Sequence, residues 1–317
     1  MAQAHGFNTN VLLRRQTAFD TPASGNHVRL PILRHSLGDA QGFEEQSYGP
    51  EGREPKDPGR SLATHGGDIE VPLCLTHMGW ILYGLFGAPV TSGSGDFTHV
   101  FKSGAASLPF HTIEVGHPET GRFLQHIGVM FNTAAFKADK KGGYGSVSIG
   151  CLGQTEVKRT SSQGGTPVEE PLDRVHQWTG AISKDGSPFA NVTECELNFS
   201  NGLVANNDII NGEAYPASID LGQSSLKGNL TARFVDDAVY DLAVSGDPFS
   251  LELSWAVSAT RAFILKAPAV RLEKAGIPME GPGGIRARFA LRGEWAASDN
   301  AMLIATLKNA RANYDHA

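Results

Sequence analysis

Gly67-Asp68-Ile69-Glu70-Val71 is the stretch that decides the fold, because Gly228-Asn229-Leu230-Thr231-Ala232 repeats its pattern ~160 residues later. Each stretch enters through a glycine and then alternates apolar and polar residues, which is typical of a half-buried strand. A short apolar helix pattern follows each one, at residues 76–86 and 235–244. The sequence therefore predicts one β-rich unit that occurs twice, as tandem domains rather than as a solenoid.

Signals on either side of these stretches also come in pairs. Hairpin-like segments precede them, at residues 10–34 and at residues 174–199, and the second contains the turn Lys184-Asp185-Gly186. Gly-Gly turns follow them, at Gly142-Gly143 and Gly283-Gly284. The two Gly-Gly turns are closer together than the other pairs, which indicates a deletion within the second copy.

The expected boundaries are a first domain at residues 1–170 and a second at residues 171–317, with residues 158–173 as the linker. Residues 36–66 are rich in Gly, Pro and charge and cannot form a core of their own. The sequence predicts a loop there that is too long for an ordinary connection and is therefore functional. Residues 200–227 take the corresponding place in the second copy.

Composition favours a mainly β protein with two cores. The chain has 317 residues, 37 Gly, 17 Pro, 40% hydrophobic and 19% charged residues, which suits many strands and turns. The net charge is −6 and both halves are mildly acidic. This balance argues against a basic surface that would grip nucleic acid.

Strand alternation is clearest at residues 146–151, 191–199, 251–257 and 285–292. In these strands Glu194 and Glu196 form one outward stripe, and three arginines form another (Arg286, Arg288 and Arg292). Two interpretations remain open. The stripes make cross-strand ion pairs of small energy on a solvated sheet, or some of the acidic positions face a shared channel.

Catalytic motifs are missing from the sequence, which contains no Walker A lysine, HExxH, CxxC or G-x-S-x-G pattern. The glycine-rich segment at residues 141–145 precedes a strand, so it is more typical of a hairpin turn than of a phosphate cradle. His111 and His117 flank Glu114 but match no metal-ligand spacing. We expect no enzymatic activity, no cofactor and no metal.

The three cysteines are odd in number and lie among apolar neighbours, so we expect buried thiols (Cys74, Cys151 and Cys195). The first ten residues lack the pattern of a secretory signal. The longest apolar run, residues 78–90, is too short to span a bilayer. These features predict a protein made in a cytosol-like compartment and not held in a membrane.

The order of these segments resembles the major tail tube protein of long-tailed bacteriophages. In the first copy the resemblance rests on Gly67-Asp68-Ile69-Glu70-Val71, the apolar helix and the strands up to the Gly-Gly turn. The second copy shows the same order through residues 236–240, 265–268 and 280–284, and is the more typical half. The resemblance implies a β-sandwich or half-barrel tube domain with one short flanking helix. Subunits of that family close into rings, and the rings stack into a hollow virion tail through which genome DNA is ejected.

Members of this family commonly contact the neighbouring ring through an N-terminal arm and a long loop, here residues 1–10 and 36–66. The charged residues of the loop are then inter-ring candidates (Glu44, Glu45, Arg53, Lys56 and Arg60). The resemblance also implies the tape measure, tail terminator and distal tail proteins as partners, and assembly in the host bacterial cytoplasm. Most relatives have one tube domain and form hexameric rings, so a duplicated chain predicts a homotrimeric ring with pseudo-sixfold symmetry.

A tube for DNA needs a bore that does not hold the DNA. Duplex DNA carries about one negative charge per 1.7 Å, so lysine or arginine on the bore would bind it and stall its passage. We therefore expect acidic side chains to line the bore, and the outward positions of the strands supply the candidates (Glu114, Glu194, Glu196 and Glu252).

Two other functions fit a mainly β chain. The first is a two-domain β-sandwich module of a virion that binds carbohydrate or a receptor, or decorates the particle. An exposed, concave aromatic patch would favour it, whereas all four tryptophans lie in apolar or strand contexts (Trp80, Trp178, Trp255 and Trp295). The second is the inner tube of a contractile injection device, which shares the fold class but usually has a single domain.

Overall fold

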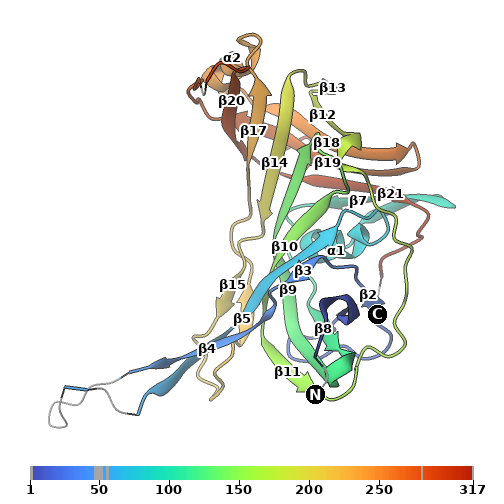
Figure 1. Ribbon diagram of the computed structural model, residues 1–317, viewed down its shortest axis with the longest axis vertical. Coiled ribbons are helices and arrows are strands. Elements are labelled where there is room, and N and C mark those ends of the chain that lie inside the picture. The colour runs from blue at the N-terminus through green and yellow to red at the C-terminus, as the bar shows by residue number, and fades with distance from the viewer. Residues whose placement is uncertain (1–2, 46–52, 55–56, 280, 316–317) are drawn as a thin grey trace.

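The computed structural model describes residues 3–45, 53–54, 57–279 and 281–315 of a mainly β protein (Figure 1). The first part of the chain contains β1 (Asn10–Arg15), β2 (Val28–Arg29), β3 (Arg34–His35), β4 (Gly38–Glu44), β5 (Gly59–Pro72), α1 (Met78–Phe86), β6 (Val90–Ser94), β7 (Asp96–Lys102), β8 (His111–His117), β9 (Arg122–Asp139), β10 (Ser146–Gly153) and β11 (Thr155–Arg159). The second part contains β12 (Gly180–Lys184), β13 (Ser187–Pro188), β14 (Val192–Ser200), β15 (Val204–Asn206), β16 (Ser218–Asp220), β17 (Ser225–Arg233), α2 (Ala238–Ser245), β18 (Phe249–Ser258), β19 (Arg261–Leu272), β20 (Arg286–Gly293) and β21 (Ile304–Asn309). The described residues also include short 3₁₀ turns at Gly6–Asn8, Pro118–Thr120 and Gln177–Thr179.

Strands pair in the same order in the two parts of the chain. The first part runs β5–β10–β9–β8–β1, and the second runs β17–β20–β19–β18–β12, with every neighbouring pair antiparallel. Residues 65–72 of β5 pair with residues 146–153 of β10 over eight consecutive positions. Residues 226–233 of β17 pair with residues 286–293 of β20 over eight positions as well. In addition, β11 pairs with β9 as β21 pairs with β19.

Irregularities recur at matching places. The register between β8 and β9 shifts between His111 and Ile113, and that between β18 and β19 shifts between Phe249 and Leu251. A bulge adds a residue on one strand and bends it. Accordingly, β9 pairs with β8 and β11 in its first half and with β10 and β14 in its second half. Figure 1 shows the result: β14, β17 and β20 follow the long axis, while β18, β19 and β21 cross them.

Apolar side chains from both parts of the chain form one continuous core, to which β5, β9, β10, β14, β17, β18, β19 and β20 contribute. Side chains such as Phe136, Phe199 and Trp255 are almost fully buried there. Every residue of α1 is buried, as its dense apolar pattern predicted, whereas α2 buries only Ala243 completely and packs one side on the core. The predicted fold class and both predicted helices are confirmed.

The predicted hairpin of residues 174–199 is wrong in its second strand. The turn at Asp185 and Gly186 forms, with positive φ angles of 50° and 78°. The strand after the turn is only the two residues of β13, because Pro188 has no N–H with which to extend the ladder. Residues 192–200 instead form β14, which pairs with β17 on one side and with β9 on the other.

Two predicted loops are also corrected. Among the described residues of the range 36–66, residues 38–44 and 59–66 are strand, because β4 pairs with β5 to form a hairpin arm that projects from the body (Figure 1). Two strands that satisfy each other's backbone groups can stand in water without an apolar core, so composition alone suggested a loop. The expected linker at residues 158–173 begins inside β11 and then packs on the first part, where the His27 N–H donates to the Gly164 carbonyl oxygen (2.9 Å).

Candidate assembly surfaces

The two parts of the chain join edge to edge through β9 and β14. Seven consecutive residue pairs connect them, from Glu194 opposite Asp139 to Ser200 opposite Thr133. On the inner face, alternate side chains are buried in the core (Ala134, Phe136, Ala138, Cys195, Leu197 and Phe199). On the outer face, Lys137 Nζ lies 2.7 Å from Glu194 Oε1. We call this contact the internal junction. The sequence analysis missed it, because nothing local shows which strand lies beside β14.

An open strand edge lies on the opposite side of the first part. Within the described residues, β3 and β4 form backbone ladders only with β5, so no strand pairs with their other edge. The Ser36 N–H donates to the Asp68 carbonyl oxygen (2.8 Å), and Leu37 points into the core with 6% of its surface exposed. An unpaired edge of this kind is a template for another strand.

The hairpin arm carries the charged residues that the sequence nominated for contacts between rings. Glu44, Glu45, Arg53 and Arg60 are exposed, and Arg60 Nη1 donates to Gln41 Oε1 across the arm (3.1 Å). Lys56 lies outside the described residues. Phe43 and Leu62 are also exposed on the arm, at 66% and 55%. The arm thus presents both charge and apolar surface, as an element that contacts a partner would.

The prediction that Glu114 faces outward is wrong. Its exposed fraction is 2%, since the segment after β11 lies over it. The Ser162 hydroxyl and the Gln163 N–H each donate to its carboxylate, both at 2.5 Å. Glu252 holds the equivalent place in β18, opposite Lys266 as Glu114 is opposite Gln125, and it is half-buried.

Glu194 and Glu196 lie on the outer face of β14, as predicted from the alternation. Glu194 bonds Lys137, while Arg292 donates to Glu273, so the proposed pairing of these glutamates with the arginines of β20 is not the one observed. The same outer face also carries Arg286 and Arg288, opposite Arg233 and Thr231. It therefore mixes both signs of charge. Glu252 belongs to β18, which crosses β14 in Figure 1, and so to a differently oriented part of the surface.

A pair of stacked histidines lies at the base of the arm. The rings of His65 and His126 are 5.1 Å apart, Asp39 Oδ1 is 2.7 Å from His65 Nδ1, and Glu156 Oε2 is 3.8 Å from His126 Nδ1. Burial lowers the pKa of His126 to about 3, helped by the positive charge that His65 can take. Burial also lowers the pKa of His65, although Asp39 opposes this shift. Both rings are therefore neutral at neutral pH.

These histidines predict a loss of stability in acid. A histidine whose pKa falls on folding binds its proton more tightly in the unfolded chain, so stability drops as pH falls below the unfolded value near 6.5. We expect each such histidine to lower the free energy of unfolding by up to about 1.4 kcal/mol per pH unit as the pH falls from 6.5 to 5. Urea unfolding across this range measures it. The His126→Gln variant should show a shallower dependence, and an unchanged slope would contradict the assignment.

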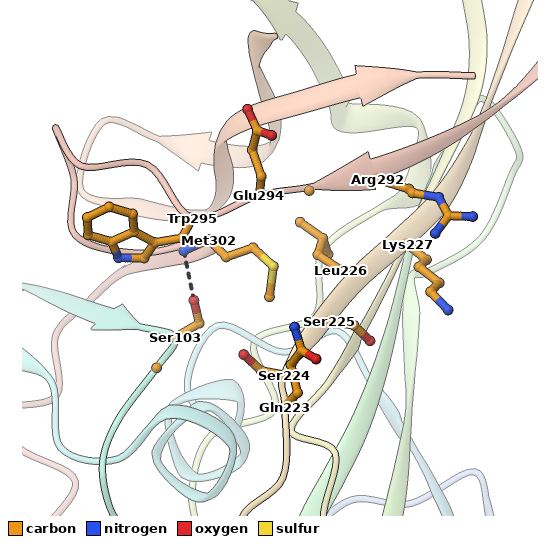
Figure 2. Close-up of a pocket in the computed structure, with 12 residues that line it drawn as sticks. Ser103, Gln223, Ser224, Ser225, Leu226, Lys227, Arg292, Glu294, Trp295 and Met302 are labelled. Atoms are coloured by element: carbon orange, nitrogen blue, oxygen red, sulfur yellow. Dashed lines mark hydrogen bonds between the residues drawn. The ribbon is translucent and has the colours of Figure 1, made fainter. Parts of the chain in front are cut away.

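A cleft of about 450 Å³ opens between β7, β17 and the end of β20 (Figure 2). Leu226 and Met302 form its floor, and polar groups such as Lys227 and Glu294 stand around it. Trp295 also lines the cleft with 61% of its surface exposed. The sequence placed all four tryptophans in apolar or strand contexts. Trp80 and Trp255 are buried, whereas Trp295 and Trp178, which is 58% exposed, reach the surface.

The histidines that flank Glu114 in the sequence have other contacts in the structure. The His111 ring stacks on that of Phe131, with centroids 5.0 Å apart, and His117 Nδ1 shares a hydrogen bond of 3.2 Å with the Thr9 hydroxyl. No group of three His, Cys, Asp or Glu side chains in the described ranges is arranged to hold a metal ion. The three cysteines are free and buried, as expected. Among the described helices, none is long and apolar enough to cross a membrane.

Comparison with protein families gives a match that covers most of the chain. The family model described as "Phage tail tube protein" matches residues 6–293, which is most of the chain. A search of curated proteins found no significant match.

Proposed function

Since the chain belongs to the phage tail tube protein family, and so to the structural proteins of the virion tail, we propose that it assembles with itself into stacked rings. The stacked rings form the hollow tube through which genome DNA leaves the virion. The family match over residues 6–293 carries this proposal, and the open edge of β3 and β4 supports it, because closing a ring of strands removes such edges. Negative-stain imaging of the purified protein tests it. We expect rings or tubes, and a protein that stays monomeric at all concentrations would overturn the proposal.

We propose further that one chain contains two copies of the tube domain, within residues 1–170 and 171–317, so that three chains close a ring. The repeated pairing order of β5–β10–β9–β8–β1 in β17–β20–β19–β18–β12 supports two copies. The expected ring mass is three times that of the 33.8 kDa chain. Native mass spectrometry measures it, and six chains per ring would contradict the trimer while leaving the tube in place.

The bore is formed, in this proposal, by the outer face of the sheet that passes through the internal junction. That sheet runs β5–β10–β9–β14–β17–β20 across both copies and is the part of the molecule that can continue around a ring. It places Glu194 and Glu196 on the bore and leaves Glu252 on the crossing strands. Glu194 then neutralises Lys137, whose charge would otherwise attract phosphate.

Replacing Glu194 and Glu196 together by lysine is therefore expected to slow DNA ejection. The two changes replace two negative charges by two positive ones in each chain, which shifts the charge of the bore by +4 per chain, and they release Lys137 from its ion pair. Ejection from virions that carry the variant measures the effect, which should weaken as added salt screens the attraction. Glu252→Lys is the matched control and should eject DNA normally. If virions with Glu252→Lys eject DNA slowly while virions with the double variant eject it normally, the bore is lined by β18 and the strands beside it instead.

The tail location implies further partners. The tape measure protein inside the tube, and the terminator and distal tail proteins at its ends, are the partners that we propose for the completed tube. Assembly takes place in the host bacterial cytoplasm before the virion is complete. Co-purification of ring assemblies with these proteins from infected cells is the measurement that checks it.

One observation favours the second candidate, a carbohydrate-binding or receptor-binding module. Trp295 is exposed in a concave site with polar neighbours, the arrangement in which aromatic side chains bind ligands (Figure 2). If this function holds, the unmodified protein should bind to an oligosaccharide array and form no rings. The Trp295→Ala variant should then lose the binding. Rings without saccharide binding favour the tube.

A further inference from the structure

We propose that neighbouring chains of the ring join by a strand pairing between residues 34–40 of one chain and residues 274–279 of the next, in a register copied from the internal junction. This inference rests on the proposed ring. It adds the partner surface, namely a second copy of this chain, and the residues that meet across it. We call this contact the seam.

The open edge of β3 and β4 is equivalent to the edge of β14 at the internal junction. Arg34 and Gly38 pair with Glu70 and Gly66 of β5. At the matching positions of β17, Thr231 and Lys227, the partners are Glu194 and Asn198 of β14. Residues 34–40 therefore correspond to residues 194–200.

Two glycines show the same equivalence in atomic detail. A Cβ on Gly67 would collide with the carbonyl oxygen of Ser36, and a Cβ on Gly228 would collide with that of Glu196. The close approach of the preceding strand thus requires glycine at the same place in each part. This requirement also explains why residues 67–71 and residues 228–232 both begin with glycine.

Residues 274–279 correspond to the second half of β9, the other partner at the internal junction. Phe131 of β9 pairs with Cys151, and Leu272 of β19 pairs with Leu291 at the matching position of β20. Counting on from these two residues places Ala275 at Ala134 and Ile277 at Phe136. The burial pattern agrees, because Ala275 and Ile277 pack on the core and the residues between them are exposed.

One difference separates the two segments. Residues 133–139 are strand, with β14 beside them, whereas residues 273–279 form no strand in the single chain. Met279 is 76% exposed, although the matching Ala138 is 3% exposed. A segment with strand alternation and an apolar side chain in solvent is what remains when the neighbouring strand belongs to another molecule.

Transferring the register gives the contacts. On the inner face Leu37 meets Ile277 and His35 meets Met279, which extends the apolar core across the seam. On the outer face Ser36 meets Pro278 and Ala40 meets Lys274. The Ser36 N–H points to β5 and therefore away from the seam. Ser36 and Pro278 then form a non-hydrogen-bonded pair of the antiparallel ladder, in which neither backbone donates across the seam. Proline is tolerated at such a position.

Cysteine cross-linking tests the register in the assembled protein. Ala40 lies four residues after Ser36, so its pair with Lys274 is also of the non-bonded kind, with Cα atoms about 4.5 Å apart and within disulfide range. Both residues are exposed, and the three native cysteines are buried. We expect the variant Ala40→Cys with Lys274→Cys to form disulfide-linked dimers and closed trimers upon oxidation, seen on non-reducing gels.

Matched variants make the result decisive. Thr133→Cys with Ser200→Cys, the equivalent pair at the internal junction, should form a disulfide within one chain. Ala40→Cys with Gly276→Cys, displaced by two residues, should cross-link at least tenfold less, since diagonal neighbours are about 7–8 Å apart. If rings form normally but the Ala40–Lys274 disulfide does not, or if the displaced pair cross-links better, the proposed seam is wrong. The proposed tube function would be unaffected by that result. A chain that forms no rings overturns the proposed function, and the seam with it.

Discussion

Replacing Phe136 by alanine is expected to lower the free energy of unfolding by about 3–5 kcal/mol, a large share of the stability of an ordinary domain. Phe136 is 1% exposed at the internal junction, opposite Leu197, and its ring lies 5.9 Å from that of Phe263. The alanine variant would leave a cavity where the two parts of the chain share their core. Urea unfolding of the unassembled chain, followed by circular dichroism, measures the loss.

Phe7→Ala is the control, because Phe7 is 83% exposed and its removal should change stability by no more than about 0.5 kcal/mol. Since one core spans both parts, we expect Phe136→Ala to shift a single transition. Two separate transitions, with only one of them shifted, would show that the parts unfold independently and would contradict a shared core.

Shortening the hairpin arm is expected to abolish tube formation while rings still form. In the variant, an Asn-Gly turn replaces residues 43–60 and joins Gly42 to Ser61 beyond the Gln41 and Ala63 pair. The described residues of the removed part, 43–45, 53–54 and 57–60, are all exposed, so folding should persist. Electron microscopy distinguishes single rings from tubes.

Charge reversal of the arm separates its two kinds of contact. Arg53→Glu with Arg60→Glu keeps the length of the arm and should shorten tubes in a salt-dependent way if charge holds adjacent rings together. Tubes of normal length from the shortened variant would give the arm another role.

The sequence predicted the parts of the fold that depend on local pattern. Alternation in residues 146–151 and 251–257 located β10 and β18, and the apolar density of residues 76–86 located α1 as a helix covered on all sides. These features depend on the spacing of apolar side chains within a few residues, which the sequence shows directly. The order in which the signals recur also led to the family that the comparison confirms.

Pairings between distant residues were not predictable in the same way. The outward placement of Glu114 failed because residues 162 and 163, remote in sequence, fold over its strand. The partner of β14 was missed because β9 reaches it only after bending at a bulge. The arm was taken for a loop because β4 and residues 59–64 of β5 are mostly exposed, so they bury too little apolar surface to leave a hydrophobic pattern.

The arm occurs once per chain, and the matching region of the second part carries the short pair β15 and β16 instead. A ring of three such chains would have six similar tube domains but only three arms, spaced one third of a turn apart. Successive rings could then lock at three equivalent angles rather than six, and every arm would meet the same kind of domain in the ring beside it. The fused chain would give the tube a defined angular phase that a ring of six identical subunits lacks.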